Sequence, residues 1–151
     1  MIKINFAKTE HIDLIADFEL ENFKAEAYSI ETIKDMMKDN YILKNNDNIF
    51  EISDEDDLIG YIIFHISSDF TDIYKIFIRE KDRKSGLATK LVEYVESLSK
   101  RYASKKLMVE VRSQNLLAIS FYERFGLKRI SVRENYYHNP TDNAIIMEKV
   151  L

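Results

Sequence analysis

Hydrophobic and polar residues alternate at the start of the chain and then change to a helical period. Ile2, Ile4 and Phe6 alternate with polar residues, which predicts a first strand. Two helical segments follow, the first after a candidate N-cap at Thr9 and the second after a candidate N-cap at Ser29. The apolar positions of the first helix are Ile12, Ile15, Leu20 and Phe23, and those of the second are Ile33, Met36 and Met37. We interpret the Met36-Met37 pair as core and not as a binding surface.

The middle of the chain has the period of strands. Residues 48–53, 58–66 and 71–78 each predict a strand, and together they predict an antiparallel meander. The acidic run over residues 54–57 lies between the first two of these strands. We interpret this run as a solvated hairpin turn, because it lacks the alternating ligand spacing of a calcium loop.

The second half of the chain returns to helices and then ends in strands. Leu87, Leu91, Val95, Leu98 and Tyr102 recur at helical spacing and predict an amphipathic helix. The further predicted elements are a strand over 106–112, a short helix beginning near Asn115 and ending at Gly126, and strands over 127–136 and 144–150. Because a helix joins strands 71–78 and 106–112, we expect these strands to be parallel with a right-handed crossover.

Composition limits the class of protein. The 151 residues are 46% hydrophobic and 32% charged, which predicts a single folded α/β domain over residues 1–151. The sequence has no apolar run long enough for a transmembrane helix, and its first residues lack the apolar stretch of a secretory signal. A cytoplasmic location is therefore expected. The absence of cysteine excludes disulfides, thiolate metal sites and a cysteine nucleophile. The histidines at 11, 65 and 138 have no metal-binding spacing, and no metal is expected.

Charge is distributed unevenly along the chain. The net charge is −4, which predicts neither direct nucleic-acid binding nor membrane binding by the whole chain. Residues 1–74 hold 6 lysines and 17 acidic residues, whereas residues 75–151 hold 16 basic and 9 acidic residues. Six basic residues lie within 75–90, beside only two acidic ones. This segment is either an anion-binding loop or a solvated loop.

The basic segment has the pattern of a phosphate-binding turn. Arg83-Lys84-Ser85-Gly86-Leu87-Ala88 lies between a predicted strand and a predicted helix. Small residues at 86 and 88 allow a ligand to approach the backbone, and the unpaired N–H groups that open a helix favour a pyrophosphate. The pattern is neither a P-loop nor a dinucleotide-binding fingerprint.

These residues resemble a known family. Arg83-x-x-Gly86-x-Ala88 before an amphipathic helix resembles the acyl-CoA-binding motif of the GNAT acetyltransferases. The later stretch is similar to the RimI branch of that family, which acetylates the N-terminal alanine of ribosomal protein number eighteen of the small subunit. It comprises Glu110-Val111-Arg112-Ser113-Gln114-Asn115, Ala118-Ile119, Phe121-Tyr122-Glu123, Phe125-Gly126-Leu127, Arg133-x-Asn135-Tyr136-Tyr137 and Asp142-x-Ala144-Ile145-Ile146-Met147.

The resemblance implies a fold, a reaction and a set of site residues. The fold is a mixed, mostly antiparallel sheet with a splayed parallel strand pair, flanked by about four helices. The reaction is direct acetyl transfer from acetyl-CoA to a protein N-terminal amine, without a metal. Glu110 would be the general base and Tyr122 the general acid. Residues implied to bind acetyl-CoA are Ile76, Phe77, Ile78, Arg83, Lys84, Ser85, Gly86, Leu87, Ala88, Thr89 and Asn115, and Tyr136 and Tyr137 would line the peptide groove.

Other interpretations of these residues remain open. A strand glutamate such as Glu110 is commonly solvated or paired with a neighbour such as Arg112, and a helical tyrosine such as Tyr122 is commonly core. Ala27-Tyr28-Ser29 departs from the Pro-Trp-Ser often found in RimI proteins. In those proteins this region helps to shape the acceptor side of the site, so the departure concerns which acceptor is used. The alternatives are an acetyltransferase of the same fold acting on lysine side chains or a small amine, and a non-catalytic acyl-CoA-binding module.

Overall fold

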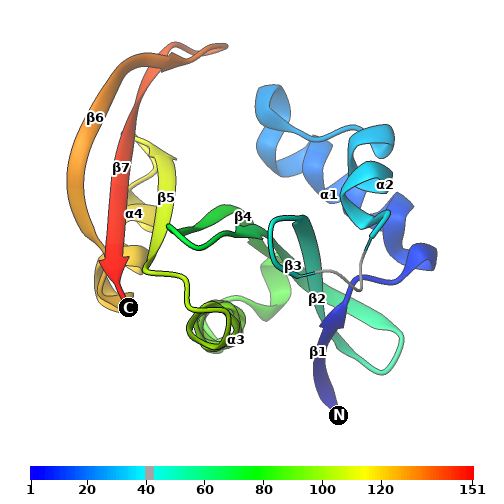
Figure 1. The fold of residues 1–151 in the computed structure, drawn as a ribbon. Coiled ribbons are helices and arrows are strands. Elements are labelled where there is room, and N and C mark those ends of the chain that lie inside the picture. The colour runs from blue at the N-terminus through cyan, green and yellow to red at the C-terminus, as the bar shows by residue number, and fades with distance from the viewer. Residues whose placement is uncertain (40–42) are drawn as a thin grey trace.

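The computed structural model describes residues 1–39 and 43–151. They form a seven-stranded sheet in the order β1-β2-β3-β4-β5-β7-β6, with helices on both faces (Figure 1). The strands are β1 (Ile2–Phe6), β2 (Asp47–Asp54), β3 (Asp57–Ile66), β4 (Thr71–Ile78), β5 (Lys106–Arg112), β6 (Lys128–Tyr137) and β7 (Asp142–Val150). Among these named strands β4 and β5 pair in parallel and the other neighbours are antiparallel, which confirms the mixed, mostly antiparallel sheet.

Helices lie where the hydrophobic period predicted them. They are α1 (Ile12–Phe23), α2 (Ile30–Met37), α3 (Leu87–Arg101) and α4 (Leu116–Phe125), with short 3-10 turns η1 (Thr9–His11), η2 (Lys24–Glu26) and η3 (Glu80–Asp82). Ser29 caps α2 by accepting a hydrogen bond from the Thr32 N–H at 3.1 Å. Gly126 ends α4 with φ 108°, in the left-handed region that glycine adopts without strain. Within the described ranges, no helix has the length and apolar character needed to span a membrane.

The prediction that Thr9 caps the first helix is wrong. Residues 9–11 form a 3-10 turn, and α1 begins only at Ile12. The turn places the His11 ring in a buried position, with Nδ1 2.9 Å from Glu51 Oε1 and Nε2 3.1 Å from the Asp56 carbonyl oxygen. The hydrogen bonds of the buried His11 imidazole therefore determine the local backbone here, and the capping propensity of threonine does not.

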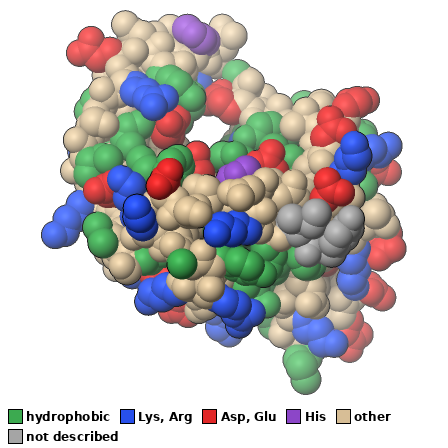
Figure 2. All heavy atoms as spheres, in the orientation of Figure 1, with side chains coloured by type: hydrophobic (Ala, Val, Ile, Leu, Met, Phe, Trp, Pro, Cys, Tyr) green, Lys and Arg blue, Asp and Glu red, His purple; other side chains and the backbone are tan. Residues whose placement is uncertain are grey.

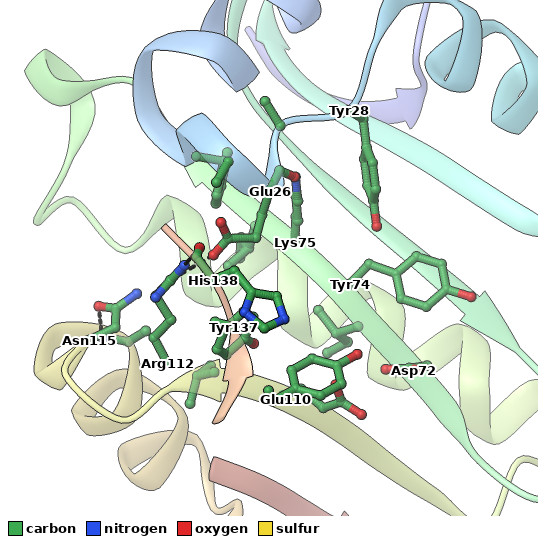
Figure 3. A pocket seen from close by; sticks show the side chains of 18 of the residues that line it. Glu26, Tyr28, Asp72, Tyr74, Lys75, Glu110, Arg112, Asn115, Tyr137 and His138 are labelled. Atoms are coloured by element: carbon green, nitrogen blue, oxygen red, sulfur yellow. Dashed lines mark hydrogen bonds and ion pairs between the residues drawn. The ribbon is translucent and has the colours of Figure 1, made fainter. Parts of the chain in front are cut away.

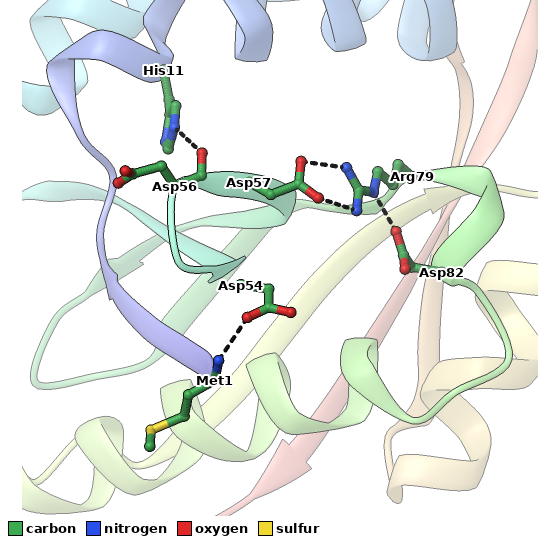
Figure 4. Close-up of polar contacts among 7 residues, drawn as sticks. All are labelled: Met1, His11, Asp54, Asp56, Asp57, Arg79 and Asp82. Atoms are coloured by element: carbon green, nitrogen blue, oxygen red, sulfur yellow. Dashed lines mark hydrogen bonds and ion pairs between the residues drawn. The ribbon is translucent and has the colours of Figure 1, made fainter.

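The acidic run at the junction of β2 and β3 forms a hairpin turn, and Figure 4 shows the partners of its Asp54 and Asp57 carboxylates. Asp54 accepts from the N-terminal amine at 2.7 Å, and Asp57 holds Arg79 through two bonds of 2.8 Å. Lys8 lies 3.2 Å from Asp56. The turn is confirmed, but three of its four carboxylates neutralise the cations of Met1, Lys8 and Arg79 and so are not simply solvated.

Two hydrophobic cores lie on opposite faces of the sheet. Side chains alternate across β3, so Ile62 packs in the core beneath α3 and α4 while Ile63 packs in the core beneath α1 and α2. Met37 is buried in the second core and Met36 packs at its edge, which confirms that the methionine pair is core. In Figure 1, β6, β7 and β5 stand apart from α1 and α2, with β4 between them.

Candidate active site

The sheet opens between its two parallel strands. The β4–β5 ladder consists of the pairs Thr71–Leu107, Asp72–Met108 and Ile73–Val109, after which the strands separate. At the same point the β3–β4 register shifts, because Ile63 pairs with Lys75 and Phe64 with Ile73. Tyr74 is thus the extra residue of a bulge, a feature that bends a strand and increases its twist. The splayed pair encloses a cleft of about 820 Å³, seen as an opening with acidic side chains at its rim in Figure 2.

Both proposed catalytic side chains line this cleft. Glu110 projects from β5 just beyond the last pair of the ladder, and its Oε1 lies 3.3 Å from Nη1 of Arg133 on β6. Glu110 is therefore paired with Arg133 and not with the sequence neighbour Arg112. Tyr122 projects from α4 and is 4% exposed, and burial raises the pKa of its hydroxyl, which keeps the group protonated at neutral pH.

The two proposed groove tyrosines also line the cleft. Their rings meet edge to face with centroids 5.1 Å apart. The β6–β7 register shifts between Arg133 and Tyr137, so the end of β6 bends where Tyr136 and Tyr137 lie. Glu110 is the largest influence that raises the pKa of Tyr136, whereas burial is the largest influence that raises that of Tyr137.

Arg112 links two loops across the mouth of the cleft (Figure 3). Its Nε donates to Glu26 Oε1 of η2 at 2.6 Å. Its terminal nitrogens donate to the carbonyl oxygens of Pro140 and His138, at 2.8 and 3.0 Å. Arg112 therefore joins the loop between α1 and α2 to the loop between β6 and β7, which limits how far the mouth can open.

A buried ion pair supports the wall of the cleft on the α1 side. Lys75 Nζ contacts both the carboxylate of Glu19 and the carbonyl oxygen of Glu26, and lies 3.9 Å from the centre of the Tyr28 ring. Glu19 is fully buried and also accepts from the Tyr61 hydroxyl at 2.6 Å and from the Tyr28 N–H at 3.0 Å. Burial lowers the pKa of Lys75, and Glu19 opposes this shift.

The backbone of β4 offers amide groups to the open side of the sheet. The Arg79 N–H donates to the Ile59 carbonyl at 2.9 Å, and in an antiparallel ladder such bonds recur at every second residue. The amide of Phe77 is therefore directed to β3, whereas those of Ile76 and Ile78 face the splay. The Ile78 carbonyl accepts from Arg83 Nε at 2.7 Å, which ties the next loop to the end of β4.

The loop before α3 has the conformation of an anion-binding turn. Lys84 and Gly86 have φ of 62° and 80°, and Leu87, Ala88 and Thr89 form the first turn of the helix. Alternation of ordinary and left-handed residues points successive N–H groups into one concavity. A Cβ at Gly86 would meet no atom within 4 Å, so the space before the helix is open. Ser85 donates to the Asp82 carbonyl, which holds the turn closed.

The basic segment contributes less charge to this turn than its composition suggests. Lys75 is buried against Glu19, and Arg79 is held by Asp57 and Asp82. The exposed basic side chains of the segment are Lys81, Arg83, Lys84 and Lys90. Asn115 lines the cleft and caps α4, because its Oδ1 accepts from the Ala118 N–H at 3.2 Å.

A family model matches most of this chain. The model is described as the acetyltransferase (GNAT) family, and it matches residues 12–127. This chain belongs to the GNAT family. It is accordingly an N-acetyltransferase that uses acetyl-CoA.

Relatives of this GNAT chain include enzymes named for N-terminal acetylation. It is 26% identical over 140 residues to a putative ribosomal protein bS18-alanine N-acetyltransferase of Bacillus subtilis, covering 93% of this chain and 89% of that protein. It is 30% identical over 103 residues to the bS18-alanine N-acetyltransferase of Escherichia coli K12, covering 65% and 68%. The solved NatC complex bound to Gag peptide and CoA has a chain of similar fold, with a TM-score of 0.84, 21% identity and 99% and 98% coverage.

The GNAT cleft also contains residues that the sequence motifs did not single out as site residues. Those with charged or titratable side chains include Glu26, Asp72, Lys75 and His138. Asp72 and Lys75 are three positions apart on β4, so strand alternation alone would place them on opposite faces, and the bulge at Tyr74 brings both to the cleft. Glu26 and His138 come from loops whose approach to β5 only the tertiary fold determines.

Proposed function

We propose that this GNAT enzyme acetylates the N-terminal α-amine of a protein, with the N-terminal alanine of a small-subunit ribosomal protein as the favoured acceptor. The observation that carries the proposal is the splay of β4 and β5, which opens one cleft to both Glu110 and Tyr122. The names of the Bacillus and Escherichia relatives support the same acceptor class.

Glu110 is the proposed base. An α-amine has a pKa of about 8 and a lysine side chain of about 10.4, so deprotonation at pH 7 costs about 1.4 and 4.6 kcal/mol respectively. A carboxylate, acting directly or through one water, is an adequate base for the less costly case. Glu110 takes one proton from the α-ammonium, and the neutral nitrogen then forms a bond to the acetyl carbon. The nitrogen releases a second proton to solvent as the carbon–sulfur bond breaks, which leaves a neutral amide.

Tyr122 is the proposed acid. Its raised pKa leaves a proton available when the carbon–sulfur bond breaks, and the hydroxyl donates that proton to the departing sulfur. The backbone N–H groups of Ile76 and Ile78 face the open side of β4 and are the proposed donors to the carbonyl oxygen, which becomes more negative during attack. The orientation of the Phe77 amide toward β3 makes it unsuitable as such a donor.

Acetyl-CoA fits the site on the evidence of its backbone. The β4–β5 ladder ends at Ile73–Val109, so the later amide groups of β4 that would bond to β5 in a continuous sheet can bond to a ligand. The open space at Gly86 admits a pyrophosphate beside the first turn of α3. The proposed pyrophosphate contacts are Lys84, Ser85, Gly86, Leu87, Ala88 and Thr89, with Arg83 beside them. Asn115 is a further proposed contact to CoA. When bound, acetyl-CoA supplies the activated acetyl group.

A panel of acceptors tests the proposed function. The enzyme is incubated with acetyl-CoA and a peptide that begins with alanine, the same peptide with a blocked N-terminus, an internal-lysine peptide and a polyamine, and products are identified by mass spectrometry. Acetylation of only the free N-terminus supports the proposal. Faster turnover of lysine or polyamine would assign the enzyme to the alternative acceptor class, and cofactor binding without any transfer would indicate a binding module.

Substitution of Tyr122 by Phe is expected to lower kcat about 10- to 100-fold, because the departing sulfur must then take its proton from water. Burial alone raises the pKa of Tyr122, with no side-chain hydrogen bond contributing within the described ranges, so the loss of its hydroxyl should leave stability nearly unchanged. Steady-state kinetics together with thermal unfolding measure the two effects. Wild-type kcat in the variant would refute the role of Tyr122.

Substitution of Gly86 by Ala is expected to raise KM for acetyl-CoA about tenfold, because the new methyl group occupies the space proposed for the pyrophosphate. The left-handed φ of 80° adds a loss of stability of about 1 kcal/mol. Gly126→Ala is the matched control, since its φ is 108° and it ends α4, so it should lose similar stability with unchanged KM. Equal KM values for the two variants would contradict the proposed pyrophosphate site.

A further inference from the structure

Asp72 is a second carboxylate at the point where the sheet splits (Figure 3). It pairs with Met108 in the β4–β5 ladder, one position before the last pair, Ile73–Val109. Side chains alternate along a strand, so Asp72 shares a face of the sheet with Met108 and with Glu110 two residues further on. Asp72 and Glu110 therefore flank the last pair of the ladder diagonally, and both line the cleft.

The two carboxylates have different surroundings. Glu110 is paired with Arg133, whereas the side chain of Asp72 makes no hydrogen bond or ion pair to any residue of the described ranges. Burial, followed by the charge of Glu110, raises the pKa of Asp72 to about 6. The groups facing Asp72 from neighbouring strands and loops are Asp47, His65, Glu110 and Arg133, with the tyrosines Tyr28, Tyr74 and Tyr136.

A partly buried carboxylate without a partner is costly, because it gives up hydration without gaining a charge or a donor. In this cleft the cost is explained if a cation arrives with the substrate. The acceptor amine is such a cation, since an α-amine with a pKa of about 8 is mostly protonated at pH 7. Arg133 already offsets the charge of Glu110, so the stronger attraction for an incoming cation comes from Asp72.

We propose that Asp72 binds the α-ammonium of the acceptor and positions its nitrogen beside Glu110, which then removes the proton. The inference rests on the proposed function, because it assigns a role in the same cleft. Asp72 exchanges no proton in this step: it accepts hydrogen bonds from the ammonium, and the proton that leaves the nitrogen passes to Glu110. The cleft thereby favours acceptors that arrive charged over neutral nucleophiles of the same shape.

Asp72→Asn tests this role, because it keeps the shape of the side chain and breaks no bond within the described ranges. KM for the acceptor is expected to rise about tenfold or more, as for the loss of a hydrogen bond between charged groups, while KM for acetyl-CoA stays unchanged. Asp69→Asn is the matched control, since it removes the same charge from the exposed turn before β4. The control should behave as wild type.

The pH profile gives a second measurement. Asp72 must be ionised to bind the ammonium, so kcat/KM of the wild type should rise with pH through about 6 and this limb should be lost in Asp72→Asn. The kinetics use whichever cationic acceptor of the panel is turned over fastest. Preference for lysine or polyamine would overturn the proposed function alone, whereas an unchanged acceptor KM and pH limb in Asp72→Asn would overturn the role of Asp72 alone.

Stability separates this role from a structural one. The folded protein holds the Asp72 proton more tightly than the unfolded chain, whose aspartates have a pKa of about 3.9. The carboxylate therefore opposes folding fully above about pH 6, and this penalty disappears as pH falls below about 3.9. Asp72→Asn should accordingly raise Tm at pH 8 and leave it near the wild-type value at pH 4. A lower Tm at pH 8 would indicate a structural role and overturn the proposal.

Discussion

Substitution of Glu110 by Gln is expected to lower kcat/KM for the acceptor about 100- to 1000-fold, because an amide cannot take the proton from the α-ammonium. KM for acetyl-CoA should change little, since the proposed cofactor contacts come from β4 and the turn before α3. Steady-state kinetics with both substrates varied give the two values.

The control for Glu110→Gln removes a comparable ion pair elsewhere. Glu123 lies 3.5 Å from Arg129, whereas Glu110 lies 3.3 Å from Arg133, and both pairs are partly exposed. Glu123→Gln should therefore match Glu110→Gln in stability while keeping full activity. If both variants retain wild-type kcat/KM, then Glu110 is not the base, and Asp72 becomes the next carboxylate to consider.

Substitution of Lys75 by Met is expected to reduce the free energy of unfolding by about 3–5 kcal/mol, because it leaves the charge of Glu19 buried and uncompensated. Glu19 has no exposed surface, and the Tyr61 hydroxyl and Tyr28 N–H are then its remaining donors. Chemical denaturation measures the loss. Acceptor KM should also rise, since Lys75 holds the loop at Glu26 against β4.

The double variant Glu19→Gln/Lys75→Met is the matched control. It removes both charges and replaces them with neutral side chains of similar length, so most of the stability lost in Lys75→Met should return. Equal losses in the single and double variants would show that the two side chains are not energetically coupled, and would assign the effect to packing of Lys75 against the Phe23 and Tyr28 rings.

Most of the secondary structure could be predicted from the local sequence pattern, because the interactions that determine it act between residues close in the sequence. The period of 2 in residues 71–78 and the period of 3.6 from Leu87 each matched the observed element. Ser29 begins α2 and Gly126 ends α4, as the chemistry of each residue predicts. Thr9 failed, because the burial of His11 against Glu51 outweighed a capping preference worth about 1 kcal/mol.

Counts of charged residues along the sequence did not predict which cations are free in the folded protein. Lys75 and Arg79 counted toward a basic anion-binding segment, yet the fold pairs them with Glu19, Asp57 and Asp82. These acids are both near and far in the sequence, and a composition count cannot tell a paired cation from a free one. The same applies to Glu110, whose ionic partner is Arg133 and not the adjacent Arg112.

The sequence by itself determined the order of helices and strands, the turn before α3 and the residues that resemble a GNAT motif, because each depends on neighbours within a few positions. Only the tertiary structure decided where the β4–β5 ladder stops, and therefore which side chains face the cleft. Among the described residues, the lack of a partner for the Asp72 side chain, the Arg133 pair of Glu110 and the link from Arg112 to Glu26 all depend on strand register and loop approach. These are set by the packing of distant segments, which local periodicity does not encode.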